Sequence, residues 1–525
     1  MKFFNTAGPV KCDKHYCLNP IERFDLEHVH TLIDQEKYFV LHAPRQTGKT
    51  SCLLALMENL NRQNRYTCLY INVEIAQAAR ENIEQGMNSI LRELASRAKI
   101  HLNDAFPESL LPHVLENEAY GTALNQCLTE WAMQSEKPLV LLIDEIDALV
   151  GDTLISVLRQ IRAGYDKRSS FFPQSILLCG VRDVRDYRIH SDKDKSIITG
   201  GSAFNVKAES LRLGNFSREE VERLFSIHTT ETGQDFLQDS LDLVWEYTMG
   251  QPWLINAIGY EACFKLETGR DRKRPVTSEM IFQSKENLIL RRETHLDQLA
   301  DKLRESRVRS VIEPILTGTA DPGIMMEDDI QYVVDLGLIR RKPHLTIANA
   351  IYKEIIPRVL TETTQDVLPF QTEWYRSADG RLDMDKLLAE FQEFFREHSE
   401  HWVERFDYKE AGPQLLLQAF LQRIVNSGGR IDREYGLGRK RTDLLVCWPV
   451  ERGLQKIVLE LKILYKSRKR TIVEGMEQTI GYMDRCGTGE GHLIIFDRRA
   501  GRKWSEKIFH KIETLGGKTV IVWGM

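Results

Sequence analysis

The sequence has few cysteines, and their spacing fits no structural site. The nine cysteines are odd in number, are scattered along 525 residues and include no C-x-x-C pair. These features exclude a disulfide-stapled scaffold and a zinc ribbon. They are typical of a protein that folds in a reducing compartment.

The sequence also lacks long apolar stretches. Runs such as Cys52–Met57 and Leu139–Ile143 are far shorter than the roughly 20 residues of a transmembrane helix. The first residues, MKFFNTAGPVKCD, show no apolar core of a signal peptide. We therefore expect a cytoplasmic protein without a membrane partner.

An overall excess of positive charge is missing as well. With 71 basic and 76 acidic residues the chain carries a net charge of −5, which argues against a simple cationic nucleic-acid binder. Residues 430–525 differ, because they hold 20 Lys and Arg against 12 Asp and Glu. This basic segment has the charge of a module that contacts a polyanion, although a run such as Lys466–Arg470 is also typical of a solvated loop.

A phosphate-binding motif follows the first apolar run, Tyr38–His42, and precedes a helical pattern over Ser51–Leu60. The motif matches G-x-x-x-x-G-K-[ST], with alanine in place of the first glycine, and consists of Ala43, Pro44, Arg45, Gln46, Thr47, Gly48, Lys49 and Thr50. In such a loop the backbone amides and the helix start, at Ser51, face the phosphates. Lys49 would reach the β- and γ-phosphates, and Thr50 would ligate Mg²⁺.

A second motif ends the apolar run Leu139–Ile143 with two carboxylates, Asp144 and Glu145. Asp144 would hold Mg²⁺ through water, and Glu145 would polarise the attacking water, because phosphoanhydride hydrolysis needs both a metal and an oriented nucleophile. The two motifs together resemble the Walker A and Walker B motifs of AAA+-type ATPases, especially those of the signal-transduction branch.

This resemblance covers about residues 14–265 and includes a Gly-x-Pro lid motif at Gly250–Trp253. It implies ATP and Mg²⁺ as ligands and a homo-oligomer formed through the ATPase domain. Arg159 and Arg162 are candidates for an arginine finger, and Arg182 for a sensor. A solvated charge remains an equal alternative for each of these arginines.

Three polar residues near the C-terminus lie on two strand patterns. Asp443 lies in Arg441–Val446, while Glu460 and Lys462 lie in Ile457–Lys462. Alternation along a strand places Glu460 and Lys462 on one face, and a turn between the strands would bring Asp443 beside Glu460. Two carboxylates and an ammonium on one face favour bound Mg²⁺, which would activate a water that Lys462 positions.

This D…E-x-K arrangement resembles the PD-(D/E)XK nucleases, with Thr442 in place of the proline. Gln478 and Tyr482, which lie four residues apart on a helical pattern, match the Q-x-x-x-Y signature of the RecB-like branch. Glu410 resembles the additional N-terminal carboxylate of that fold, and Glu434 is a rival for the same role. The resemblance covers about residues 405–500 and implies Mg²⁺, or alternatively Mn²⁺, and a nucleic-acid partner, with DNA favoured and RNA as the alternative.

The predicted fold class is α/β. It combines a P-loop parallel-sheet ATPase core over 1–214, a helical lid over 215–270, a winged-helix-like domain over 275–360, a linker and helix over 361–400 and an α/β PD-(D/E)XK domain over 401–525. Acidic residues in the winged-helix-like segment would oppose phosphates, so we expect a structural or interdomain role there rather than DNA binding.

The sequence thus predicts an ATP-hydrolysing, Mg²⁺-dependent nuclease in which the AAA+-like module regulates phosphodiester cleavage. Bacterial proteins with this architecture resemble phage-defence or mobile-element factors. The alternative is a nucleotide-operated switch or scaffold whose nuclease-like fold is inert. A translocase is disfavoured because the chain has a single P-loop.

Overall fold

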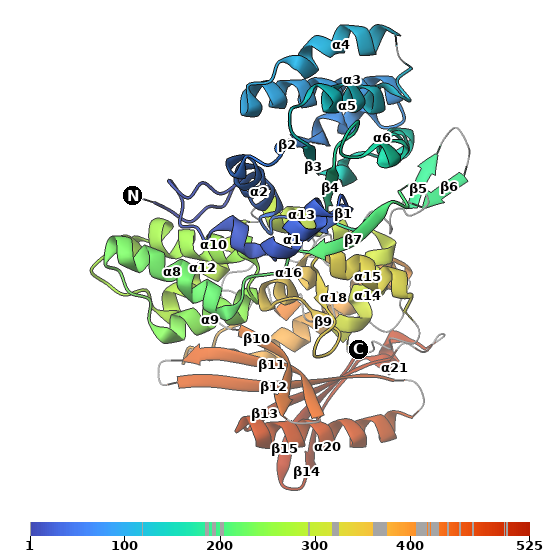
Figure 1. Ribbon diagram of the computed structural model, residues 1–525. Helices are drawn as coiled ribbons and strands as arrows, with labels where there is room; N and C mark the ends of the chain where they lie inside the picture. The colour runs from blue at the N-terminus through green and yellow to red at the C-terminus, as the bar shows by residue number, and fades with distance from the viewer. Residues whose placement is uncertain are drawn as a thin grey trace. The chain divides into compact units, whose positions relative to one another are not determined.

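Two compact units make up the computed structural model of the chain (Figure 1). The first comprises Met1–His295 and Ile330–Ile351, and the second Leu296–Asp329 and Tyr352–Met525. The structure describes residues 2–117, 119–183, 188–191, 196–199, 204–291, 294–317, 325–360, 375–377, 379–405, 417, 420–421, 430–437, 440–450, 453–464, 467–497, 499 and 502–525.

The first unit is built on a five-stranded parallel sheet with the order β2-β3-β4-β1-β7. The strands are β1 (Tyr38–His42), β2 (Thr67–Asn72), β3 (Leu139–Asp144), β4 (Ser175–Gly180) and β7 (Lys207–Arg212). Every residue of β3 and β4 is buried. Their near-continuous apolar sequences follow from this burial, because helices cover both faces of a parallel sheet.

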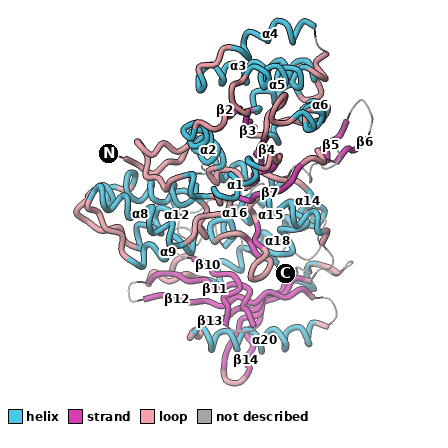
Figure 2. The backbone as a smooth tube through the Cα atoms, in the orientation of Figure 1, coloured by secondary structure: helices cyan, strands magenta, loops and turns pink. Residues whose placement is uncertain are grey.

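Helices lie on both faces of this sheet (Figure 2), and a layer of buried apolar side chains lies on each face. One layer packs against α1 (Leu26–Asp34) and α2 (Lys49–Gln63). The other packs against α3 (Ile83–Arg97), α4 (Phe106–Asn117), α5 (Ala123–Gln134) and α6 (Gly151–Ala163). A short hairpin of β5 (Arg188–Ser191) and β6 (Ser196–Thr199) follows β4. The α/β sandwich expected of the P-loop core is present.

The segment 215–270, expected to form a helical lid, contains α8 (Arg218–Thr232), α9 (Gln238–Thr248), α10 (Pro252–Tyr260) and α11 (Glu267–Arg270). The helix α12 (Ser278–Arg291) follows and packs against α9. Ser217 and Glu220 form the predicted capping box at the start of α8. Gly250 has a φ of 78°, and a Cβ built there would overlap the carbonyl oxygen of Phe216. The lid turn therefore requires glycine at this position.

The segment before α1 packs on this lid. Tyr16 is buried and its hydroxyl lies 3.1 Å from Nδ1 of His228, while the indole of Trp253 donates to the carbonyl of Thr6 at 2.9 Å. The structure also joins Cys12 and Cys17 in a disulfide, which their scattered spacing did not predict. The other seven cysteines are free and buried.

Three helices and a small hairpin follow the lid: α13 (Thr294–Leu303), α14 (Ser306–Thr317), α15 (Glu327–Asp335), β8 (Ile339–Arg340) and β9 (Thr346–Ile347), with α16 (Ala350–Leu360) after them. These elements lie in the segment 275–360 that was expected to be winged-helix-like, and that assignment stays a prediction. Residues 330–351 belong to the first unit, whereas the rest of the segment after residue 295 belongs to the second.

The second unit contains a six-stranded mixed sheet with the order β10-β11-β12-β13-β15-β14. Its strands are β10 (Arg430–Leu437), β11 (Lys440–Val450), β12 (Gly453–Ile463), β13 (Glu490–Phe496), β14 (Phe509–Leu515) and β15 (Lys518–Gly524). Strands β12, β13 and β15 are parallel, and the others join antiparallel. The two strand patterns expected over Arg441–Val446 and Ile457–Lys462 lie in β11 and β12.

Helices cover the two faces of this mixed sheet. The helix α20 (Arg468–Cys486) connects β12 to β13 and packs on one face, and α18 (Met384–Arg405) packs on the other. A short helix, α21 (Trp504–Lys507), precedes β14. The sequence over Pro413–Val425 also favours a helix, and of this segment only Leu417, Phe420 and Leu421 lie among the described residues.

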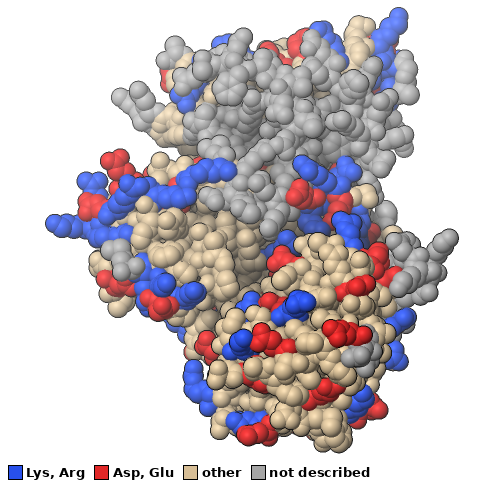
Figure 3. Space-filling view, turned by 90° about the horizontal axis from the view of Figure 1, so that it is seen from above, with Lys and Arg blue, Asp and Glu red and all other residues tan. Residues whose placement is uncertain are grey.

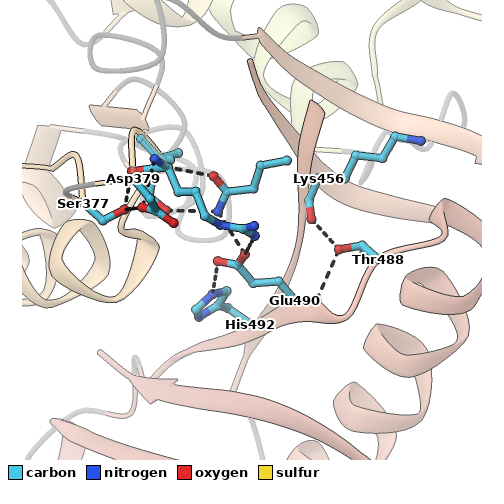
Figure 4. Close-up of polar contacts among 9 residues, drawn as sticks. Ser377, Asp379, Lys456, Thr488, Glu490 and His492 are labelled. Carbon is cyan, nitrogen blue, oxygen red and sulfur yellow. Dashed lines mark hydrogen bonds and ion pairs between the residues drawn. The ribbon is translucent and has the colours of Figure 1, made fainter. Parts of the chain in front are cut away.

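A polar network attaches the segment before α18 to this sheet (Figure 4). The Gln455 side chain accepts from the amide of Leu382 at 2.9 Å and donates to its carbonyl at 3.1 Å. The Gln455 amide also donates to Glu490 at 3.0 Å, and Arg381 lies 3.9 Å from the same carboxylate. The end of the predicted linker is thus held against β12 and β13.

Candidate functional site

The phosphate-binding loop connects the carboxyl end of β1 to α2. Gln46 and Gly48 have φ values of 58° and 94°, so the loop turns sharply before the helix begins at Lys49. The Lys49 ammonium donates to the carbonyls of Ala43 at 2.9 Å and Pro44 at 3.1 Å and is largely buried. It therefore lies folded across the loop that a triphosphate would occupy.

The carboxylate of Asp144 lies beside the start of α2, because the carboxyl ends of parallel strands meet at one edge of the sheet. Its Oδ2 accepts from the hydroxyl of Thr50 at 2.7 Å and from that of Tyr70 at 3.0 Å. Its Oδ1 accepts from the amide of Glu145 at 2.9 Å. A hydroxyl and a carboxylate in contact form a set of hard oxygen ligands that suits Mg²⁺.

The second carboxylate of the motif, Glu145, leaves the strand in a left-handed conformation with φ 56°. Burial raises its pKa, and the neighbouring Asp147 raises it further, while Lys49 opposes the effect. A carboxyl with a raised pKa, close to a phosphate-binding lysine, is suited to hold and polarise a water.

Arg23 is a site residue that the sequence analysis missed. It ends the turn Pro20–Arg23, and its guanidinium donates to the carbonyl of Thr47 at 3.0 Å and to that of Gly214 at 2.7 Å. It also lies 4.3 Å over the ring of Phe216. Arg23 thus joins the phosphate-binding loop to the start of the lid, a contact between distant segments that no local motif signals.

The sensor candidate Arg182 follows β4, next to the P-loop strand. Its guanidinium lies 4.7 Å over the ring of Tyr332 and 4.0 Å from Asp335, both on α15. Arg212, at the end of β7, donates to the carbonyl of Val334 at 3.1 Å. The end of α15 therefore lies at the edge of the sheet that carries the nucleotide motifs. Arg159 and Arg162 are exposed on α6, and their role as fingers stays a prediction.

The C-terminal module brings together four of the residues predicted for its site. The Lys462 ammonium lies 2.6 Å from Oε1 of Glu460, whose side chain is 3% exposed. Lys462 and the α20 residues Gln478 and Tyr482 line one cavity of about 430 Å³, whose full lining is Lys462, Glu474, Glu477, Gln478, Gly481, Tyr482 and Arg485. The lysine of the E-x-K motif and both residues of the Q-x-x-x-Y motif thus face a common space.

The strand register supports the expected position of Asp443. Leu444 pairs with Leu459 in the antiparallel ladder, so Asp443 comes level with Glu460 in the backbone. The pairs Arg433–Leu444 and Tyr435–Thr442 place Glu434 opposite Asp443 on the other side. The side chains of Asp443 and Glu434 are not described, and Glu410 lies outside the described residues.

Among the side chains that the structure describes, no three His, Cys, Asp or Glu residues gather as a metal cage would require. Lys and Arg are interspersed with Asp and Glu over the described surface seen in Figure 3. In the predicted basic cluster, Arg470 donates to Glu474 at 2.7 Å and Arg468 lies 4.7 Å over Phe509. None of the helices in the described ranges has both the length and the hydrophobicity of a bilayer-crossing segment.

Comparison with known proteins bears on the first unit. Residues 8–306 match the model of a family described as an AAA-like domain, whereas the chain matches no curated protein. Similar solved structures include the Walker-type ATPase PABY2304 of Pyrococcus abyssi, with 17% identity and a TM-score of 0.45 over 67% of this chain and 99% of that one.

Two further similar structures are Cdc6p of Pyrobaculum aerophilum and the RuvB Holliday junction branch migration motor of Thermotoga maritima. The former has 15% identity and a TM-score of 0.35 over 65% of this chain and 93% of that one. The latter has 12% identity and a TM-score of 0.32 over 64% and 95%. The family assignment rests on the family match, which spans both nucleotide motifs and the lid.

Proposed function

Since this chain belongs to the family of AAA-like domain proteins, we propose that its first unit binds ATP with Mg²⁺ and hydrolyses it, and that nucleotide controls a metal-dependent nuclease in the C-terminal module. The observation that carries the ATPase half is the 2.7 Å contact between Thr50 and Asp144. It unites the two motifs at one edge of the sheet.

The roles in ATP hydrolysis follow from this geometry. Thr50 and Asp144 would hold Mg²⁺, which neutralises charge on the β- and γ-phosphates. Lys49 would exchange its two loop carbonyls for phosphate oxygens, and the backbone amides from Arg45 to Ser51 would surround these oxygens. Glu145 holds the attacking water by accepting a hydrogen bond from it, which orients the water toward the terminal phosphorus.

The proposal for the C-terminal module rests on the Glu460–Lys462 contact beside a cavity that Gln478 and Tyr482 also line. Glu460 and Asp443 would hold Mg²⁺, or Mn²⁺, with Glu410 as a further candidate, and the metal would supply an activated water. Lys462 stabilises the charge that develops on the scissile phosphate. Gln478 and Tyr482 position the substrate or the lysine.

The proposed substrate is nucleic acid, and DNA rather than RNA. The excess of basic residues over 430–525 supports a polyanionic partner. Assembly of copies through the ATPase module belongs to the same proposal, because fingers at Arg159 or Arg162 would act on a neighbouring copy's nucleotide.

A cleavage assay on single- and double-stranded DNA and RNA tests this function, run with ATP, with a non-hydrolysable analogue and without nucleotide. We expect Lys462→Ala and Glu460→Gln to lower cleavage at least about a hundredfold and to leave ATP hydrolysis unchanged. Lys456→Ala is the matched control, because this lysine of the same strand donates to the carbonyl of Cys486 at 3.3 Å, away from the cavity lining.

Unchanged cleavage in Lys462→Ala would remove the assignment of the nuclease site. If the wild-type protein cleaves no substrate, calorimetric titration with Mg²⁺ and Mn²⁺ tests the alternative function, a nucleotide-operated switch with an inert nuclease-like fold. An inert fold that serves a nucleotide-operated switch shows no metal binding that depends on Glu460.

A further inference from the structure

The strand β14 forms an edge of the mixed sheet (Figure 1). It pairs with β15 on one side, and no strand in the described part of the chain pairs with its other side. Two large apolar side chains are nevertheless open to solvent there, since Ile512 is 67% and Leu515 is 40% exposed. An open edge with exposed apolar residues is a template for pairing with another chain.

The sequence of this strand, Phe-His-Lys-Ile-Glu-Thr-Leu over 509–515, complements itself when read antiparallel about Ile512. In that register Lys511 lies opposite Glu513 of the partner subunit, and the reverse pair forms on the other side of the axis. Ile512 meets its own copy, and Phe509 lies opposite Leu515 of the partner subunit. Opposite charges and apolar residues placed directly across two strands both stabilise the pairing.

Neighbouring symmetric registers lack this complementarity. In an antiparallel pair, residues directly opposite each other point to the same face, so a two-fold axis perpendicular to the sheet must pass beside a residue that meets its own copy. An axis at position 511 would set Lys511 opposite its own copy, and an axis at position 513 would do the same for Glu513. Like charges directly opposite each other are destabilising. The charge pattern therefore selects one register and one partner, a second copy of this chain.

We propose that two copies of the protein pair through β14, antiparallel about a two-fold axis at Ile512, so that their six-stranded sheets become continuous. The pairing satisfies outward backbone groups of the edge strand and covers the exposed Ile512. This interface is separate from the assembly expected through the ATPase module, and it does not depend on nuclease activity.

Sedimentation equilibrium of the full chain without nucleotide tests the proposal. We expect the wild type to dimerise, and Glu513→Lys or Lys511→Glu to raise the dissociation constant at least about tenfold, which corresponds to about 1.4 kcal/mol. Mixing the two single variants should restore a dimer, because Lys511 and Lys at 513 in one chain then face Glu at 511 and Glu513 in the other. A monomeric wild type, unchanged single variants or a mixture that fails to associate would overturn the proposal.

Cross-linking tests the register itself. Directly opposite residues in an antiparallel pair have Cα atoms roughly 4.5–5.5 Å apart, within the range of a disulfide. Ile512→Cys should therefore give a covalent dimer under mild oxidation. Thr514→Cys is the control, because the register sets this exposed position opposite His510 of the partner subunit. Cross-linking of Thr514→Cys in place of Ile512→Cys would contradict the proposed axis.

Discussion

The carboxylate of Asp335 lies 4.0 Å from the guanidinium of Arg182, and the two side chains are 1% and 14% exposed. Arg182 follows the strand beside the P-loop strand, whereas Asp335 ends α15. Gly337, two residues further on, is so close to Pro44 that a Cβ there would lie 2.8 Å from the proline ring. The end of α15 therefore contacts the sensor candidate, and the turn that follows it contacts the phosphate-binding loop.

If Arg182 senses nucleotide, Asp335 competes with the phosphates for its guanidinium. We expect Asp335→Asn to raise the affinity for MgATP roughly fivefold, at the lower end of measured coupling energies between sites. Titration with a fluorescent ATP analogue measures this change. Arg182→Ala serves as the second arm of a double-mutant cycle. An increase that persists in the Arg182→Ala background would show that Asp335 does not act through Arg182.

The fold of the first unit was predictable because its strands β1 to β4 are largely buried on both faces. Burial of that kind produces continuous apolar runs such as Leu139–Ile143, which the sequence displays directly. The edge strand β14 is mostly exposed and mixes charged, polar and apolar residues, and half of the residues of β10 are charged. Neither strand has a continuous apolar run of the kind that identified its neighbours, so neither was predicted from the sequence.

The candidate site was predictable where its chemistry is local in sequence. The Lys49 loop and the Asp144–Glu145 pair are contiguous motifs, and their approach follows from parallel-strand geometry. Arg23 and Asp335 reach the site from segments distant in the chain, and no spacing rule links an isolated arginine or aspartate to a P-loop. Three-dimensional packing alone supplies these two contacts.

Removal of the Lys49 ammonium should abolish tight nucleotide binding. Lys49→Ala deletes the buried cation that faces the phosphate-binding loop, and we expect MgATP affinity to fall about a hundredfold, as when a preorganised charge contact is lost. Isothermal titration calorimetry gives the affinity. Arg62→Ala, an exposed cation at the other end of α2, should bind MgATP as the wild type does. Equal affinities in the two variants would contradict the assignment of the loop.

The pH dependence of ATP hydrolysis should report Glu145. The carboxylate is the active form, and burial together with Asp147 raises its pKa above 4.5. Hydrolysis should therefore decline on acidification at a higher pH than an ordinary glutamate would give. Asp147→Asn removes one cause of the raised pKa and keeps an oxygen that can accept from the amide of Val181, so the acid limb should move to lower pH.

Glu145→Gln completes this test. The substitution should lower the hydrolysis rate by roughly a hundredfold or more while MgATP still binds, because a neutral amide cannot polarise the water as a carboxylate does. An acid limb that stays in place in Asp147→Asn would assign the titration to another group.

Gly250 in the lid turn combines a φ of 78° with close approach to the carbonyl of Phe216, and a matched glycine separates these two effects. Gly233 ends α8 with a φ of 73° and has nothing within 4 Å of a built Cβ. Gly233→Ala should cost roughly 1–2 kcal/mol for the left-handed backbone alone. Gly250→Ala should lower the free energy of unfolding by about 1–3 kcal/mol more, because the added methyl group would displace backbone atoms that cannot move easily.

Urea denaturation followed by tryptophan fluorescence compares the free energies of unfolding of the two variants, since Trp253 and Trp245 flank the turn. Equal losses would mean that the lid turn needs glycine for its backbone conformation only, and a larger loss in Gly250→Ala would establish close packing against Phe216 as the reason for the Gly-x-Pro sequence.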